Sequence, residues 1–399
     1  MRTATHRHPA LVVHSSKPFN AESPRSVLAD AAATPTPLFF VRHHMPVPEV
    51  DEGEYELEVR DGRAAGKAGG SDEDRTIKLS LERLRADFPK VEVAATLQCT
   101  GNRRSSSNEH APTKGINWGV GAISNAVWGG ARLRDVLEAA GYDVEAMARA
   151  EGGEVHVRFE GLDTDAAGDP YGSSVPASRL LRDGSPVLAY EMNGEPLPRD
   201  HGAPVRMVVP GVTGARSVKW LGAIEVADEE STSFWQRQDY KIYPPGTTFA
   251  NKKDKEEHAI PIQDTPVQSA ITTPTPGTRL GARAESVPCV GYAFSGGGRG
   301  ILRVDLSADG GETWTQAVLQ RPEMLEGRTY AWTLWHADVP LPVEARARAA
   351  EGQEEKVEVL VRAIDDEHNM QPKDTGDVWN MRGLLTTSWH GVDIVLVEE

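Results

Sequence analysis

The segment LQCTGNRRS, residues 97 to 105, places Cys99 close to two consecutive arginines, Arg103 and Arg104. A cysteine thiolate is a nucleophile and a ligand for soft metals, and neighbouring guanidinium groups stabilise this deprotonated form. The glycine and asparagine between them allow a tight turn, so Arg104 can fold back toward the sulfur. A lone cysteine is more often a small buried residue, so this segment predicts a reactive or metal-binding site only if other unusual segments accompany it.

Six such segments occur in the chain. They are FFVRHHMPVP (39–48), NWGVGAISNAVWGGARLRDVL (117–137), FEGLD (159–163), LPRDHGAPVRMVVPGVTGARSVKWL (197–221), WQRQDYK (235–241) and VWNMRGLLTTSWH (378–390). Together with LQCTGNRRS they resemble, in order and over nearly the whole chain after residue 37, the sulfite oxidase family of molybdenum enzymes. The segment SGGGRGILRVDLSADGGETW (295–314) is similar to the C-terminal dimerisation domain of that family.

The resemblance implies an α+β protein, in which a mixed α/β molybdopterin-binding domain precedes an immunoglobulin-like β-sandwich. It implies that Cys99 is the one protein ligand of the metal. It also implies that Arg42, Arg104 and Arg382 line an oxyanion pocket beside that metal. Guanidinium groups form charge-assisted, partly bidentate hydrogen bonds to small oxyanions, and sulfite fits such a pocket by size and charge.

By the same resemblance, Tyr240 is the active-site tyrosine and Trp118 belongs to the pocket wall; on general grounds each would be a core aromatic. A phosphate favours Arg, Lys and backbone N–H groups, and the amino edge of a pterin favours a carboxylate. The adjacent His43 and His44 should point to opposite faces of a strand, so they are not expected to bind one metal together. The implied cofactor contacts are Phe40, Val41, Arg42, His43, His44, Cys99, Asp163, His201, Arg206, Ser217, Val218 and Lys219.

The implied activity is molybdenum-dependent oxidation of sulfite to sulfate by oxo transfer, with electrons passed to an external acceptor. Candidate acceptors are a cytochrome, another soluble acceptor or dioxygen. Residues 1–37 are too short for the cytochrome b5 domain of vertebrate members and no HPGG motif occurs, so we expect no haem. The resemblance also implies a homodimer through the C-terminal domain. Two positions depart from the eukaryotic pattern: His43 replaces Asn, and Thr100 replaces Ala.

Other functions remain open at this point. Assimilatory nitrate reductase shares both domains, but usually lacks the arginine at position 382 and carries haem and flavin domains. Molybdenum-dependent sulfoxide reductases lack the C-terminal sandwich. Cys99 could instead be the nucleophile of a thiol hydrolase with His201 or His110 as base, although the separated arginine motifs would then be unexplained. The chain could also be a non-catalytic binding module.

Composition narrows the class of protein. A net charge of -16 over 399 residues disfavours nucleic acid, and no apolar run approaches the length of a membrane span. Because no export signal is visible, we expect a cytoplasmic protein, with a periplasmic location left open. Cys99 and Cys289 fit a reducing compartment but leave one disulfide possible.

The pattern of elements supports two domains after an extended N-terminal segment (1–37): a catalytic domain (38–255) and a dimerisation domain (256–399). Alternation predicts strands in LFFVRHH (38–44), YELEVR (55–60) and VEV (91–93), and helical spacing appears in LSLERLRADF (79–88) and ARLRDVLEAAGY (131–142). A loop is expected over 61–74 and a linker over 244–278. Regular β runs after the linker predict the sandwich.

Overall fold

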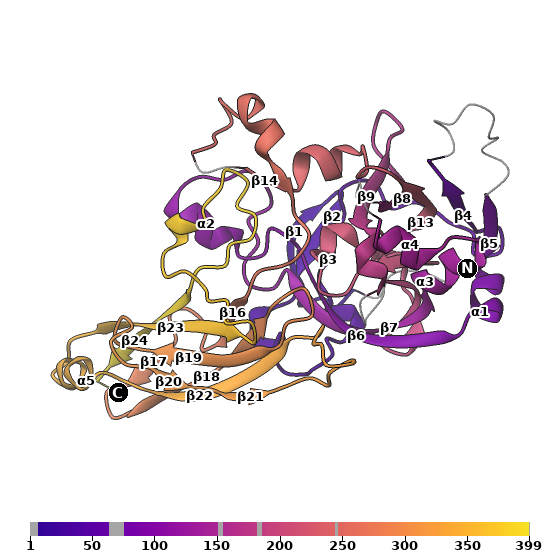
Figure 1. Cartoon of the computed structure of the whole chain (residues 1–399). Coiled ribbons are helices and arrows are strands. Elements are labelled where there is room, and N and C mark those ends of the chain that lie inside the picture. The colour runs from indigo at the N-terminus through magenta and orange to yellow at the C-terminus, as the bar shows by residue number, and fades with distance from the viewer. Residues whose placement is uncertain (1–6, 64–75, 151–154, 182–185, 244–245, 399) are drawn as a thin grey trace.

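The computed structural model describes residues 7–63, 76–150, 155–181, 186–243 and 246–398, and Figure 1 shows how they are arranged. A mixed region of sheets and short helices forms one part of the molecule, and a β-sandwich built from the later residues forms the other. The predicted fold class is therefore confirmed. Most of the loop expected over 61–74 lies outside the described residues.

Two sheets form the mixed region. In the first, all neighbouring strands are antiparallel except the parallel pair β4 and β13. Its order is β5 (Ile77–Ser80), β4 (Glu56–Asp61), β13 (Leu221–Ala227), β8 (His156–Thr164) and β9 (Pro170–Pro176). The second has the order β11 (Glu195–Pro196), β10 (Val187–Met192), β7 (Ile123–Arg132) and β6 (Lys90–Gln98), with β12 (Arg206–Val208) also paired to β10.

Short helices connect these strands, and the two predicted helices are present. Helix α1 (Leu81–Asp87) begins at Ser80, whose hydroxyl accepts a hydrogen bond from the Arg83 N–H. Helix α3 (Leu133–Ala139) buries its apolar face, and Gly141 follows with a φ of +85°, a left-handed conformation that favours glycine after a helix. Two further α-helices of this region are α2 (Arg104–His110) and α4 (Val144–Ala148).

An N-terminal hairpin forms part of this region. Strands β1 (Val12–Ser16) and β2 (Phe19–Glu22) make a hairpin, and β2 pairs with β3 (Val41–Arg42). The sequence suggested an extended segment here, because residues 1–37 lack a strong strand pattern. The hairpin contacts β3 and the loop before β7, where the N–H groups of Gly119 and Gly121 donate to the Glu22 carboxylate, and local sequence does not encode these contacts.

The β-sandwich contains two sheets packed over one apolar core, in which Trp335, Val361 and Ile394 are buried. Strand β24 alternates between buried and half-buried residues along its length, as expected for one face on the core. One sheet is β16 (Gln268–Thr273), β18 (Ser286–Phe294), β22 (Thr333–Pro340) and β21 (Val318–Gln320). The other is β17 (Arg279–Gly281), β24 (His390–Val397), β23 (Glu355–Asp365), β19 (Ile301–Ser307) and β20 (Thr315–Gln316), and helix α5 (Val343–Ala350) covers one end.

The predicted linker over 244–278 contains regular structure. Strand β15 (Ile260–Pro261) pairs with β14 (Lys241–Ile242), and β16 lies within the last third of the predicted linker. Strand β16 pairs with β18, and five of its six residues are buried. Its sequence QSAITT is largely polar, so the sequence did not indicate a core strand. The exact domain boundaries stay predictions. Among the described residues, no helix is long and apolar enough to cross a membrane.

Arg103 joins the two parts of the molecule. Its guanidinium is fully buried and donates hydrogen bonds to the backbone carbonyls of Ser388 (2.6 Å) and Trp389 (3.0 Å), just before β24. Burial lowers the pKa of Arg103 to about 10. The charge therefore lies in a poorly solvated interface, where its partners are carbonyl oxygens.

Replacing Arg103 by Leu should destabilise the protein, because the carbonyls of Ser388 and Trp389 each lose a hydrogen bond to a charged donor, and such bonds contribute about 1.5–3 kcal/mol each. We expect a clearly lower urea unfolding midpoint. The matched control is Arg149→Leu, since the Arg149 side chain is 72% exposed and its ion pair with Glu145 lies at the surface. Equal midpoints for the two variants would contradict the structural role of Arg103.

Candidate active site

Cys99 lies immediately after β6, where the chain turns toward α2. Its N–H donates to the Ala122 carbonyl (2.9 Å), and its own carbonyl accepts from the Asn102 N–H (2.9 Å). The Asn102 side chain closes this turn, because its Oδ1 accepts from the Ala122 N–H and its Nδ2 donates to Tyr292 Oη. These contacts fix the position of the sulfur, which is 8% exposed. Both cysteines are free thiols, so the disulfide left open by the sequence is not formed.

The two consecutive arginines separate at this turn. Arg103 has a φ of +63°, which directs its side chain away from that of Arg104 and toward the β-sandwich. Arg104 begins α2, and its Nε donates to the Arg382 carbonyl (2.7 Å) while Nη1 donates to the Ile116 carbonyl (2.5 Å). Gly101 leaves room for this guanidinium, since a Cβ there would lie 2.4 Å from Arg104 Nη2. The predicted tight turn thus leaves space for the Arg104 side chain.

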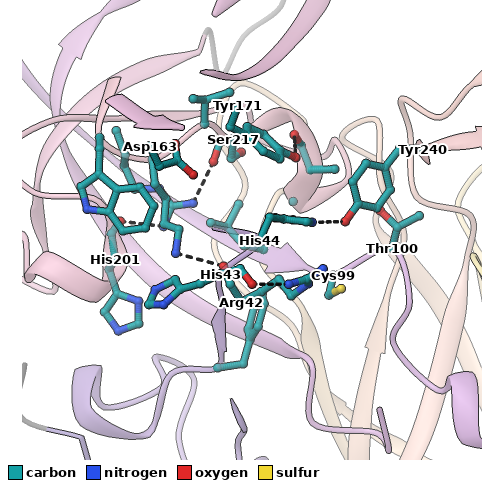
Figure 2. Close-up of a pocket in the computed structure, with 18 of the residues that line it drawn as sticks. Arg42, His43, His44, Cys99, Thr100, Asp163, Tyr171, His201, Ser217 and Tyr240 are labelled. Atoms are coloured by element: carbon teal, nitrogen blue, oxygen red, sulfur yellow. Dashed lines mark hydrogen bonds between the residues drawn. The ribbon is translucent and has the colours of Figure 1, made fainter. Parts of the chain in front are cut away.

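One pocket joins the regions that carry the predicted site residues. Figure 2 shows Cys99, Thr100 and Tyr240 toward one end, with Asp163 and His201 toward the other. The pocket holds about 690 Å³ of space free of protein atoms, part of it open to solvent. The predicted residues that line it are Phe40, Arg42, His43, His44, Cys99, Asp163, His201, Arg206, Ser217, Val218, Lys219 and Tyr240.

Four predicted residues lie outside the lining: Val41, Trp118, Arg104 and Arg382. Val41 is buried in β3, and Trp118 is fully buried in the same apolar cluster as Cys99. Arg104 and Arg382 lie behind the wall, where Arg382 forms an ion pair with Asp239. Burial lowers the pKa of Arg104, and the nearby Cys99 and Tyr240 act in the opposite direction, so the guanidinium is electrostatically coupled to the pocket residues. Of the three predicted arginines, only Arg42 contacts the open space directly.

His44 and Tyr240 form a hydrogen-bonded pair beside Cys99. His44 Nε2 bonds Tyr240 Oη, and the imidazole packs 4.5 Å from the ring of Trp235. Burial lowers the pKa of His44 well below its ordinary value, and the nearby Arg42 lowers it further. Burial raises the pKa of Tyr240. At neutral pH the pair is therefore an uncharged imidazole and a protonated phenol, which can hold or relay a proton at Tyr240 Oη.

The far end of the pocket is cationic. Arg206 donates to the carbonyls of His201 (3.0 Å) and Ser217 (3.1 Å), but its buried Nε has no hydrogen-bond partner among the described residues. Burial lowers the pKa of Arg206 to about 9 and that of His201 to about 3. Lys219 Nζ donates to the carbonyls of Arg42 and Asp200, both at 3.0 Å. These buried donors fit a phosphate, which would supply the charge and acceptors they lack.

Asp163 is the acidic group of this end. Burial raises its pKa to about 6, while the neighbouring Lys219 acts in the opposite direction. The carboxylate is thus mainly ionised at neutral pH and can accept hydrogen bonds from an amino group. A phosphate site beside a carboxylate, with a thiol at the opposite end, fits the donor set that a molybdopterin needs.

The structure adds residues to the site that the sequence did not indicate. Tyr171 lines the pocket from β9 and stacks on Trp235, and Trp220 lies under the Lys219 ammonium at 4.4 Å. Asn20 accepts a hydrogen bond from Arg42, and Asp239 forms an ion pair with Arg382. Trp220 and Asp239 lie within matched motifs, but the motifs gave them no role, and Tyr171 and Asn20 lie outside the motifs and reach the site through tertiary contacts.

The hydrolase alternative lacks its catalytic pair in this structure. A thiol nucleophile requires a base within hydrogen-bond reach. Among the described residues, no hydrogen bond joins Cys99 to His201 or His110; His201 lies toward the far end of the pocket and His110 is exposed at the end of α2. The geometry therefore gives no support to this alternative.

Comparison with protein families agrees with the chemistry of the pocket. Residues 44–235 match the oxidoreductase molybdopterin binding domain, and residues 259–397 match the Mo-co oxidoreductase dimerisation domain. The solved structure of the sulfane dehydrogenase SoxCD from Paracoccus pantotrophus is similar, with a TM-score of 0.71 and 25% identity over 98% of this chain and 86% of that chain. Fold and site thus define a molybdopterin-dependent oxidoreductase.

Full-length relatives define the family more closely. The chain is 50% identical to sulfite oxidase from Gallus gallus over 96% of its length and 78% of that protein. It is 41% identical to sulfite oxidase from Arabidopsis thaliana, over 97% of this chain and 94% of the relative. Against mitochondrial sulfite oxidase from Rattus norvegicus, at 46% identity, it spans 66% of the relative. The chain belongs to the sulfite oxidase family.

The cationic end of the pocket yields a test of cofactor retention. Arg206→Met should lower the molybdopterin content of purified protein at least about tenfold, since a lost charge-assisted bond costs roughly 1.5–3 kcal/mol. Pterin content per chain can be measured by fluorescence after release and oxidation. Arg199→Met is the control, because Arg199 is 46% exposed and bonds only surface carbonyls and Glu49. Normal pterin content in Arg206→Met would contradict the assignment.

Proposed function

We propose that this chain is a sulfite oxidase or sulfite dehydrogenase, which oxidises sulfite to sulfate and passes two electrons to an external acceptor. The observation that carries the proposal is the convergence of Cys99, Arg42 and Tyr240 on one pocket, with Arg104 close behind. Oxidation of sulfite by water releases two protons and two electrons. The site must therefore bind an oxyanion, handle protons and communicate with a redox group.

In this proposal the arginines capture the anion. Arg42 faces the pocket, and its guanidinium can bond two oxygens of sulfite, with Arg104 and Arg382 adding positive potential from the wall. Because Arg382 is paired with Asp239, its contribution is smaller than that of an unpaired cation. A pyramidal dianion gains most from this arrangement, which supports sulfite as substrate.

Cys99 would hold the metal, and the opposite end of the pocket would hold the rest of the cofactor. Arg206, Lys219 and His201 suit the phosphate, and Asp163 suits the amino edge of the pterin. When bound, the molybdenum cofactor supplies the two-electron redox chemistry. The protein binds and orients the anion, and the phenol of Tyr240 supported by His44 holds a proton at the reacting end.

A nitrate reductase activity is the second candidate. The nitrate reductase [NAD(P)H] of Hordeum vulgare is 37% identical over 97% of this chain, which covers 42% of that protein. Sulfite oxidation has better support, because the sulfite oxidases are more similar and the chain has an arginine at position 382, where nitrate reductases usually lack one.

The proposal extends to partners. We infer a homodimer formed through the region that matches the dimerisation domain, which light scattering of the purified chain can test. We expect no haem in the catalytic domain (38–255) or in the dimerisation domain (256–399). The electrons would then pass to a cytochrome, another soluble acceptor or dioxygen. The cytoplasm stays the predicted location.

The experiment compares sulfite oxidation with ferricyanide and nitrate reduction with reduced viologen in the purified holoenzyme. We expect sulfite turnover to dominate and Cys99→Ser to abolish it, with molybdenum measured in parallel. Cys289→Ala is the matched control, because Cys289 is buried in the sandwich, where burial raises the pKa of its thiol to about 12. Full sulfite turnover in Cys99→Ser, or turnover of nitrate alone, would refute the proposal.

A further inference from the structure

Asn20 contacts Arg42 from the N-terminal hairpin. In the pairing of β2 with β3, Asn20 lies opposite Arg42, and its side chain is only 2% exposed. Asn20 Oδ1 accepts hydrogen bonds from Arg42 Nη1 (3.1 Å) and from the His43 N–H (2.9 Å). One buried amide oxygen thus holds both the side chain and the following backbone of the arginine that faces the pocket.

The orientation of this amide is fixed by its surroundings. Nδ2 donates to Ser15 Oγ (2.9 Å) and to the Pro18 carbonyl (3.0 Å), both within the same hairpin. Arg42 and the His43 N–H can only donate and the Pro18 carbonyl can only accept, so a flipped amide would lose these three hydrogen bonds. The hairpin therefore presents an oxygen, and only an oxygen, to Arg42.

Charge distinguishes Asn20 from the partner of the other arginine. Arg382 is paired with the carboxylate of Asp239, which offsets much of its positive charge. Asn20 is neutral, so it restrains the Arg42 guanidinium while leaving the full charge available to a bound anion. Residue 20 also lies before residue 44, where the match to the molybdopterin binding domain begins, so the family match does not cover it.

We propose that Asn20 is a positioning residue for anion capture: it fixes the Arg42 guanidinium toward the pocket through a neutral acceptor and thereby sets the affinity for sulfite and sulfate. This inference rests on the proposed function for sulfite turnover, but binding of sulfate tests it separately.

The test compares Asn20→Ala and Asn20→Asp in the purified holoenzyme. Alanine removes one of the two acceptors of Arg42 Nη1 and leaves the other, the His43 carbonyl, so the guanidinium is less restrained and we expect KM for sulfite to rise about three- to tenfold. Aspartate adds a carboxylate beside Arg42 and competes with the anion, so we expect a rise of about tenfold or more. In both variants kcat should change less than KM, and the dissociation constant of sulfate, measured by calorimetric titration, should rise in parallel with KM.

Ser15→Ala is the matched control for damage to the hairpin. It removes one partner of Asn20 Nδ2 but leaves the contact with Arg42 in place, so KM and sulfate affinity should stay within about twofold of wild type. The inference is overturned if Ser15→Ala raises KM as much as the Asn20 variants do, or if Asn20→Asp has no larger effect than Asn20→Ala. A wild-type protein that binds sulfate without oxidising sulfite would refute the proposed function, while the order of sulfate affinities would still test Asn20.

Discussion

Positive charge is buried around one pocket, and the surrounding structure must supply acceptors for it. Arg42, Arg206 and Lys219 line that pocket and Arg104 lies behind its wall, and burial lowers the pKa of Arg104, Arg206 and Lys219. Carbonyl oxygens satisfy part of this donor set, but Arg206 Nε stays without a partner among the described residues. Burying such donors costs free energy unless an anion binds them. The pocket is therefore suited to anionic ligands, although the protein as a whole is strongly acidic.

The scaffold holds these charges through contacts between segments distant in sequence. The turn after β6 sends Arg103 into the sandwich and Arg104 toward Cys99, so one short motif anchors two domains and builds the reactive end of the pocket. Segments on either side of the catalytic core contribute restraints: the N-terminal hairpin holds Arg42, and the segment before β24 contacts Arg104 through the Arg382 carbonyl. The site is therefore distributed over nearly the whole chain.

Local sequence predicts the parts of this arrangement that have local causes. The periodicity of α1 and α3, the strands of the sandwich and the turn at Cys99 follow from side-chain pattern and turn residues, and most of the residues found to line the pocket were predicted from matched motifs. The places where prediction and structure differ have tertiary causes. The N-terminal hairpin and β16 depend on strand partners that are distant in the sequence. Arg382 forms an ion pair with Asp239 outside the pocket lining, and no motif indicates this pairing.

The central claim is that the sulfur of Cys99 holds a metal at the end of a pocket whose arginines face an oxyanion. An anomalous difference map, collected at the molybdenum absorption edge from crystals of the purified holoenzyme, tests it most directly. We expect one strong peak per chain within bonding distance of Cys99 Sγ and beside Arg42. A molybdenum peak elsewhere in the protein, with Cys99 left as a free thiol, would contradict it.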